Sequence, residues 1–195
     1  MELLIFATNN KNKVAEIKSI LNGVMDVCSL KDAGIEIDIP EPHQTLEENA
    51  TEKSSCIYKL TNKNCFSEDT GLEVVALNGA PGVKSARYAD EDIRFENNIK
   101  KLLFELNGEI NRTAQFRTVI SLMLDNKEYQ FEGICKGKII EVEKGEQGFG
   151  YDSIFIPDGS DFTFAEMNMD EKNKFSHRKK ATSKLIAFLK KYNGE

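Results

Sequence analysis

The first 23 residues of the chain constrain the fold more than any other segment. Leu3–Thr8 is a short apolar run followed by polar residues, which predicts a buried β-strand and a loop. Apolar residues then recur at helical spacing over residues 14–21, and Gly23 follows as a helix stop signal. A buried strand that leads through a short loop into a helix is typical of an α/β domain, and we expect the second strand within Val24–Leu30.

The patterns further along the chain predict more helices and strands. A capping box formed by Thr45 and Glu48 predicts a helix that runs to about Thr61. The other expected elements are a helix over Asp92–Leu106, a hairpin of Thr113–Leu124 and Glu128–Val142, a short strand at Ser153–Ile156 and a last helix after Ser176. Because a hairpin interrupts the alternation of helices and strands, we predict an α/β fold with a mixed sheet flanked by helices, in two lobes with a cleft.

Length and composition limit the class of protein. A chain of 195 residues fits one domain over residues 1–195. The formal net charge of -6 argues against a surface that coats nucleic acid. Four dispersed cysteines without a CxxC motif, and only two histidines, argue against a structural zinc site. The chain has neither an apolar run long enough for a membrane helix nor a signal-peptide pattern, so we expect a cytoplasmic protein with reduced thiols.

The polar loop after the first strand is the first candidate site. It contains Thr8, Asn9, Asn10, Lys11, Asn12 and Lys13. Free backbone N–H groups and the positive end of a helix favour an anion at such a place, and the loop adds hydrogen-bond donors and a lysine charge. The loop lacks the glycine pattern of a P-loop, so a plain strand–helix turn with solvated lysines stays open.

Two acidic motifs are the second candidate. Glu68 and Asp69 precede Thr70 at what we expect to be a strand end, where α/β sheets usually bind ligands. Carboxylates there suit Mg²⁺, and Glu41 in a loop is a further potential ligand. In an extended chain Glu68 and Asp69 point to opposite faces, so the metal would meet only one of them. A solvated acidic turn is the alternative.

One lysine interrupts an otherwise apolar helix face. Leu46, Ala50, Ile57 and Leu60 fall on one stripe of the second helix, and Lys53 lies in its middle. An amine at this position must snorkel to water, pair with an acid or reach into a cleft.

Two further segments combine features that suit a nucleotide. Gly145–Asp152 has glycines that allow close backbone approach, beside the aromatic rings of Phe149 and Tyr151. A β-hairpin turn with core aromatics is the alternative, and the sequence of that segment slightly favours it. Lys172–Lys180 is basic and places His177 and Arg178 at the start of the last helix, where cations oppose the helix dipole. Cations at this unfavourable position indicate a compensating partner, which is an anion or a group rich in acceptors. The alternative is a charged helix end that is simply solvated.

Taken together and in this order, the motifs resemble the inosine triphosphate pyrophosphatase (ITPase) family. The resemblance covers nearly the whole chain and rests on ATNNKNKVAEI, LEENATEKS, SEDTGLEVVALNGAPGVKSARYA, GFGYDSIFIPDG and AEMNMDEKNKFSHRKKA. Two positions depart from the family pattern, which commonly has glycine at the place of Asn9 and D-D-S-G at the place of Glu68–Gly71. Asparagine tolerates a positive φ better than most residues, so the loop can keep its shape.

The resemblance implies an activity, a cofactor and a set of roles. It implies a cytosolic, homodimeric hydrolase with one or more Mg²⁺ per subunit, which converts ITP, dITP or XTP to the monophosphate and pyrophosphate and so cleanses the nucleotide pool. It implies Asp69 as proton acceptor for the attacking water, with Lys53 as the second catalytic residue and Asp69, Glu41 and Glu68 as candidate metal ligands. Residues 8–13 and Thr70 would bind the substrate. The base would meet Phe149, Asp152, Lys172, His177 and Arg178, and Gly150 and Tyr151 beside them would also bind the substrate.

Hypoxanthine and xanthine carry a carbonyl at position 6 where adenine carries an amine. N–H groups of His177 or Arg178 would donate a hydrogen bond to the carbonyl but find no acceptor at the amine, and an unpaired buried donor costs about 1–3 kcal/mol. Guanine shares that carbonyl, so its exclusion needs a further contact that the sequence does not identify.

Three other functions remain open at this stage. The first is a pyrophosphatase for pyrimidine or modified bases, and the second is a nucleotide-binding regulatory module without catalysis. The third is a nucleic-acid-binding protein that uses the basic last helix, which the acidic total charge opposes. We therefore expect no stable nucleic-acid complex and no membrane association.

Overall fold

The computed structural model describes residues 3–90 and 92–194, and these residues divide into two compact units. Unit 1 contains residues 3–69, 118–133 and 178–194. Unit 2 contains residues 70–90, 92–117 and 134–177. Three long strands contribute residues to both units.

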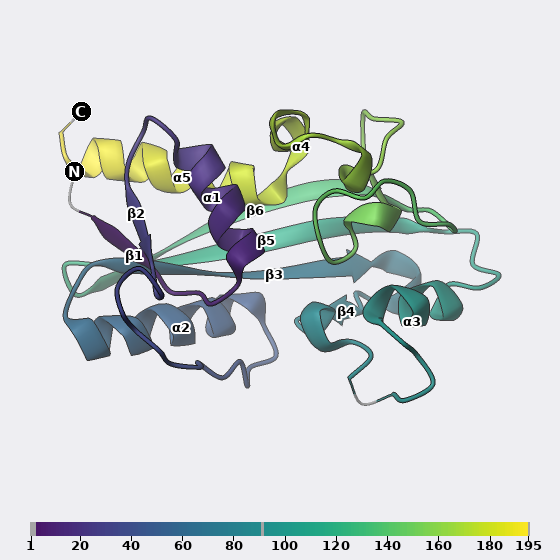
Figure 1. Cartoon of the computed structure of the whole chain (residues 1–195), viewed down its shortest axis with the longest axis horizontal. Helices are drawn as coiled ribbons and strands as arrows, with labels where there is room; N and C mark the ends of the chain where they lie inside the picture. Colours follow the sequence, from purple (N-terminus) through teal and green to yellow (C-terminus); the bar gives the residue numbers. More distant parts are fainter. Residues whose placement is uncertain (1–2, 91, 195) are drawn as a thin grey trace. The chain divides into compact units, whose positions relative to one another are not determined.

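The strands form a mixed sheet (Figure 1). They are β1 (Leu4–Phe6), β2 (Val27–Ser29), β3 (Cys65–Val74), β4 (Pro81–Gly82), β5 (Thr113–Leu124), β6 (Lys127–Ile139) and β7 (Phe155–Pro157). The order is β2-β1-β3-β5-β6-β7, and β4 pairs with the end of β3. β1 runs parallel to β2 and to β3, whereas β4 and β7 run antiparallel to their neighbours. The parallel strands follow from the helical crossovers that connect them.

Helices cover both faces of the strands of unit 1. α1 (Lys11–Leu21) and α5 (His177–Tyr192) lie on one face, and α2 (Leu46–Thr61) lies on the other (Figure 1). Alternate strand residues supply the two cores, because Phe6 and Phe66 pack with α1 and α5 whereas Ile5 and Cys65 pack with α2. Phe6 and Phe66 stack at 4.6 Å between ring centroids. Burial on both faces explains why β1 is a continuous apolar run.

Local signals explain where the elements of unit 1 begin and turn. The Asn10 side chain accepts hydrogen bonds from the amides of Asn12 and Lys13 and so caps α1. Thr45 accepts from the Glu48 amide and caps α2 as predicted, but the Glu48 carboxylate accepts from the Thr45 hydroxyl, where a capping box would have it accept from the Thr45 backbone amide. Asp125–Asn126 adopts positive φ angles of 49° and 61°, the geometry of a tight two-residue hairpin turn between β5 and β6.

Unit 2 has a separate core. α3 (Asn98–Glu105) contributes Leu102, and the residue after its end, Leu106, is also buried. Both pack with Phe116 of β5 and Phe155 of β7. α4 (Met169–Phe175) begins at the capping box of Asn168 and Glu171.

The predicted α/β class with a mixed sheet flanked by helices is confirmed. The elongated form and the central cleft stay predictions. None of the helices among residues 3–90 and 92–194 is long and apolar enough to cross a membrane.

Four details differ from the sequence predictions. Glu68–Gly71 lies inside β3 and not at a strand end, because the strand continues to Val74. α3 starts at Asn98 and not near Asp92, since Asn97 accepts from the Lys100 amide and caps the helix there. Leu60, expected in the apolar stripe of α2, is 59% exposed near the end of the helix. α4 was not predicted, since its seven residues are too few for a periodic pattern.

Candidate active site

β3 carries Glu68 and Asp69 on opposite faces of the strand, as the extended backbone predicts. Asp69 contacts Lys53 of α2, whereas Glu68 contacts Arg178 of α5. Both carboxylates are buried, at 1% exposed for Glu68 and 5% for Asp69. One strand therefore holds two separate ionic clusters, both within unit 1.

The first cluster joins Lys53 to two carboxylates. The Lys53 ammonium donates to Glu41 Oε1 at 2.5 Å and to Asp69 Oδ1 at 3.1 Å. Side chains from α2, from β3 and from the loop before α2 thus meet at one amine. The lysine on the apolar stripe is 6% exposed and pairs with acids, which is one of the three outcomes that its position allowed.

The second oxygen of Asp69 is the unusual feature of this cluster. Asp69 Oδ2 is buried and accepts no hydrogen bond from any described residue. Burial raises the pKa of Asp69, and this effect outweighs the lowering by Lys53 and Lys13. For Lys53, burial opposes the charge, but Asp69 and Glu41 outweigh it and raise the pKa. Asp69 is thus an acid with one open oxygen and an enhanced affinity for a proton.

The second cluster surrounds Arg178. The guanidinium donates from Nε to Glu68 Oε2 at 2.7 Å and from Nη2 to Glu68 Oε1 at 2.9 Å. Its Nη1 group donates to Glu16 of α1. Lys13 Nζ approaches Glu68 Oε1 at 3.4 Å. The bidentate pair explains how a 1% exposed arginine is tolerated, because its donors face acceptors.

The charges of this cluster support one another. Burial opposes ionisation of Glu68, but Arg178 and Lys13 outweigh it and lower the pKa of this carboxyl. Burial also lowers the pKa of Lys13, against the opposing effect of Glu68. The misfit of Arg178 at a helix start, which indicated a compensating partner, is thereby balanced by carboxylates of the chain itself.

The first loop is organised by its own side chains. Asn10 caps α1, so the Asn12 and Lys13 amides are already hydrogen-bonded. Thr8 Oγ1 accepts from the Asn10 amide at 3.2 Å. Lys11 and Asn12 are exposed. Anion binding by this loop stays a prediction, and the helix amides contribute less to it than the sequence indicated.

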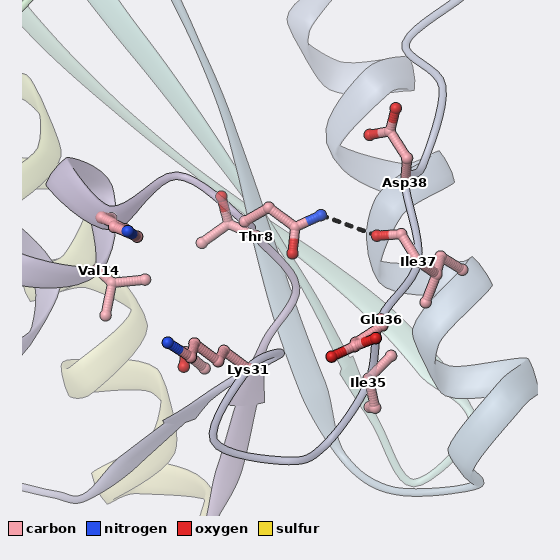
Figure 2. A pocket seen from close by; sticks show the side chains of 10 residues that line it. Thr8, Val14, Lys31, Ile35, Glu36, Ile37 and Asp38 are labelled. Carbon is pink, nitrogen blue, oxygen red and sulfur yellow. Dashed lines mark hydrogen bonds between the residues drawn. The ribbon is translucent and has the colours of Figure 1, made fainter.

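A pocket of about 530 Å³ lies beside this loop (Figure 2). It is lined by Thr8, Asn9, Lys11, Val14, Ser29, Lys31 and residues 35–38. The Asn9 side chain donates to the Ile37 carbonyl at 2.8 Å, and Figure 2 shows this bond as a dashed line. The pocket shares the loop with the ionic clusters, but Lys53 and Asp69 do not line it.

Unit 2 brings together a different part of the predicted set. Lys172 Nζ donates to Asp152 Oδ2 at 2.6 Å, and the Phe149 amide donates to the same oxygen at 2.9 Å. The ammonium lies 5.4 Å from the ring centroid of Phe149. Gly148 has a φ of 75°, and a Cβ there would lie 2.1 Å from Asp152 Oδ2. The glycine is needed for this loop to wrap the carboxylate.

The remaining predicted residues of unit 2 have varied surroundings. His177 is buried and stacks on Phe116 with 4.7 Å between ring centroids. Tyr151 lies in the core, where its hydroxyl donates to the Ser85 carbonyl at 3.0 Å. Gly150 adopts a φ of 62° in a turn, and Thr70 is half-buried in β3. Substrate contacts by these four residues stay predictions, and the core alternative for Tyr151 agrees with its burial.

The sequence analysis did not predict two residues that contact the predicted site residues. Glu16 is buried on the same face of α1 as Ile17 and Ile20, and its carboxylate accepts from Arg178. A charged residue within that apolar stripe was a detectable signal, like the one noticed for Lys53. Phe116 stacks on His177, but a phenylalanine within a strand gave no sign of this partner.

The donor set of the first cluster fits a hard divalent cation. The open Asp69 Oδ2 and the partly exposed Glu41 both offer carboxylate oxygen, which Mg²⁺ prefers. In the described part of the chain, no three His, Cys, Asp or Glu side chains are grouped to hold a metal ion. A cation here would need oxygens from a bound phosphate or water, which is how Mg²⁺ usually binds in phosphate sites.

Comparison with known proteins defines the class to which this fold and this site belong. A family model described as the Ham1 family matches residues 4–188. The chain therefore belongs to the Ham1 family, and the resemblance found in the sequence is confirmed.

Individual relatives sharpen this assignment. The chain is 50% identical to the dITP/XTP pyrophosphatase of Flavobacterium psychrophilum, over 96% of the chain and 98% of the relative. It is 47% identical to the protein of the same name from Porphyromonas gingivalis, over 97% and 98%. Among solved structures, the Staphylococcus aureus Ham1 protein matches with a TM-score of 0.86 and 40% identity, over 98% of this chain and all of that one.

Proposed function

We propose that this protein is a nucleoside-triphosphate pyrophosphatase that hydrolyses non-standard purine nucleotides such as dITP, XTP and ITP to the monophosphate and pyrophosphate. The observation that carries the proposal is the buried Lys53–Asp69–Glu41 cluster with one open carboxylate oxygen, in a chain half identical to a dITP/XTP pyrophosphatase. The activity would remove such nucleotides from the pool that supplies DNA and RNA synthesis.

The proposed cofactor is Mg²⁺, for which Asp69 Oδ2 and Glu41 are the candidate ligands together with phosphate oxygens. When bound, it would polarise the phosphoryl group under attack. Of the three predicted ligands, Glu68 has the weakest support, because both of its oxygens accept from Arg178. Across the two clusters four carboxylates face three cationic groups, so full ionisation leaves one negative charge in excess.

We assign roles to the residues of the chain as follows. Asp69 Oδ2 is assigned either to the metal or to the proton of the attacking water, because one oxygen cannot serve both while Oδ1 accepts from Lys53. Lys53 holds Asp69 and Glu41 in place and offers its charge to the phosphates. Thr8, Asn10 and Lys13 position the triphosphate from the first loop. Lys11, Asn12 and Thr70 stay predicted contacts.

For unit 2 we propose recognition of the base. Phe149 offers a ring face, and the Lys172–Asp152 pair offers a donor and an acceptor in fixed positions. His177 would donate to the position-6 carbonyl. Arg178 is less suited to that role than the sequence indicated, because Glu16 and Glu68 already accept from its guanidinium.

We further propose that residues 1–195 act as one pyrophosphatase domain and that the protein works in the cytoplasm as a homodimer, without a stable nucleic-acid or membrane partner. These statements rest on the family resemblance. Light scattering after size-exclusion chromatography tests the dimer.

The decisive experiment measures pyrophosphate release from dITP, XTP, ITP, GTP and ATP, with Mg²⁺ and with a chelator. We expect fast, Mg²⁺-dependent release from the first three and slow release from GTP and ATP. Tight nucleotide binding without turnover would favour the regulatory module, and preference for a pyrimidine triphosphate would favour the other pyrophosphatase.

A further inference from the structure

Residues 35–41 form a connector between the pocket of Figure 2 and the first ionic cluster. Apolar and acidic side chains alternate over residues 35–39, and Ile35 and Ile39 pack against the core cluster that lies under α2. The Ile35 amide donates to the Leu30 carbonyl at 2.9 Å. At the other end of the connector, Glu41 Oε1 accepts from Lys53 at 2.5 Å.

The middle of this connector is held from the first loop. Asn9 Nδ2 donates to the Ile37 carbonyl at 2.8 Å, and this bond joins residues 28 positions apart at the pocket (Figure 2). The next residue, Asn10, caps α1, so the loop that holds the connector is itself anchored to a helix. The flanking Glu36 and Asp38 side chains are exposed.

The position of Glu41 depends on this hold. Glu41 lies four positions after Ile37 in the sequence, a reach of at most about 14 Å for an extended chain. Glu41 has to meet the Lys53 ammonium, which also binds Asp69 at 3.1 Å. A connector released at Ile37 would let the Glu41 carboxylate drift from the amine and from the open oxygen of Asp69.

We propose that Asn9 is a positioning residue, whose side-chain amide holds residues 35–41 so that Glu41 meets Lys53 beside Asp69. The inference deepens the proposed function and rests on it for its catalytic consequence, whereas its structural consequence stands alone. It also gives Asn9 a role different from the direct substrate contact that its place in the first loop indicated.

The test compares Asn9→Ala and Asn9→Asp with wild type. Alanine removes the amide, and aspartate keeps its shape but presents an acceptor to the Ile37 carbonyl. Asp38→Ala is the matched control, because it truncates an exposed side chain of the same connector. Thermal melts of all variants establish that they fold.

The first measurement is methyl NMR relaxation of isoleucine-labelled protein, without metal and without nucleotide. Relaxation at the Ile37 and Ile39 methyl groups reports the fraction of molecules in which the connector is released from Asn9. We expect both Asn9 variants to increase this fraction by about three- to tenfold, the usual effect of one lost hydrogen bond. Ile17 and Ile57, which lie in the cores, should not change. Asp38→Ala should match wild type.

The second measurement is the kinetics of XTP hydrolysis. We expect kcat to fall in both Asn9 variants in proportion to the lost fraction of held connector, by at most about three- to tenfold. The Mg²⁺ concentration for half-maximal rate should rise, with KM for the nucleotide nearly constant. A KM effect with unchanged relaxation at Ile37 would show a direct substrate contact and overturn the proposal. Unchanged relaxation and kinetics would also overturn it. If wild type hydrolyses none of the nucleotides, the proposed function fails, and the NMR result still decides whether Asn9 holds the connector.

Discussion

The two compact units bury their charges in different ways. Unit 1 buries a set of ionisable side chains that spans α1, α2, α5 and β3, with Lys13 and Glu41 partly exposed at its edges. Unit 2 buries the pair of Lys172 and Asp152 among aromatic rings. The first arrangement leaves one carboxylate oxygen without a hydrogen bond, which suits binding of a proton or a cation. The second fixes one donor and one acceptor beside aromatic rings.

This contrast shows that buried charges can have different roles within one chain, reactivity in unit 1 and fixed hydrogen-bonding geometry in unit 2. A buried ion pair by itself adds little stability, because desolvation offsets the attraction. The clusters of unit 1 are therefore better explained by reactivity and by the positions that they fix. The following changes break or sharpen the contrast.

Asp69→Asn should have the largest effect. It removes the carboxylate oxygen assigned to the metal or to the proton of the attacking water, so we expect turnover to fall about 10²–10⁴-fold while nucleotide binding survives. Single-turnover kinetics and calorimetric titration with a nucleotide separate the two effects. Near-normal turnover would remove Asp69 from the chemistry.

Arg178→Ala should destabilise unit 1 strongly. It leaves the carboxylates of Glu16 and Glu68 buried without their guanidinium, at a cost of about 3–5 kcal/mol of unfolding free energy. Urea denaturation measures the loss. Lys184→Ala, at an exposed position of the same helix, should stay within about 0.5 kcal/mol of wild type.

Acid should act on the same cluster. The pKa of Glu68 is lower in the folded protein than its ordinary value of 4.5, so its contribution to stability is present above that value. The contribution is lost as the pH falls through the folded pKa. Urea titrations between neutral pH and acid should show this loss in wild type, and a pH-independent stability over that range would contradict it.

Lys172→Met should cost less, because it breaks one pair instead of two. We expect a loss of about 3 kcal/mol, since the methionine keeps contact with Phe149 and Phe164 but leaves Asp152 without the ammonium. Adding Asp152→Asn removes the buried charge and should recover part of the loss. A double variant that is less stable than the single one would refute this account.

Glu128→Gln tests how much the side-chain hydrogen bonds between α2 and the β5–β6 hairpin contribute to stability. Glu128 Oε1 accepts from Thr51 of α2 at 2.5 Å and from Ser121 of β5 at 2.8 Å. Weakening these bonds should cost about 1 kcal/mol in thermal or urea unfolding. Lys127→Gln, at the neighbouring exposed position, serves as the control.

Cys65 should show the smallest response. Burial raises the pKa of its thiol to about 12, and its Sγ donates to the Ser54 carbonyl. Iodoacetamide at pH 8 should therefore leave Cys65 unmodified in the folded protein, because the thiolate is the reactive form. Mass spectrometry that finds Cys65 modified before the partly exposed Cys28 and Cys56 would contradict the burial.

The sequence by itself determined the features that depend on near neighbours in the chain. The caps at Asn97 and Asn168 were not predicted, but the cap at Thr45 and the hairpin turn after Leu124 were correctly predicted, since each depends on a few consecutive residues. The opposite orientation of Glu68 and Asp69 followed from the strand alone. The motifs also identified the family, because their order and spacing are specific.

The tertiary structure alone decided which charges meet. Arg178 pairs with Glu68 across 110 positions of the chain and with Glu16 across 162. No local pattern encodes such a pairing, because it depends on how α1 and α5 pack on one face of β3. For the same reason, only the folded chain shows that Asn9 reaches Ile37 and that Asp69 keeps one oxygen open.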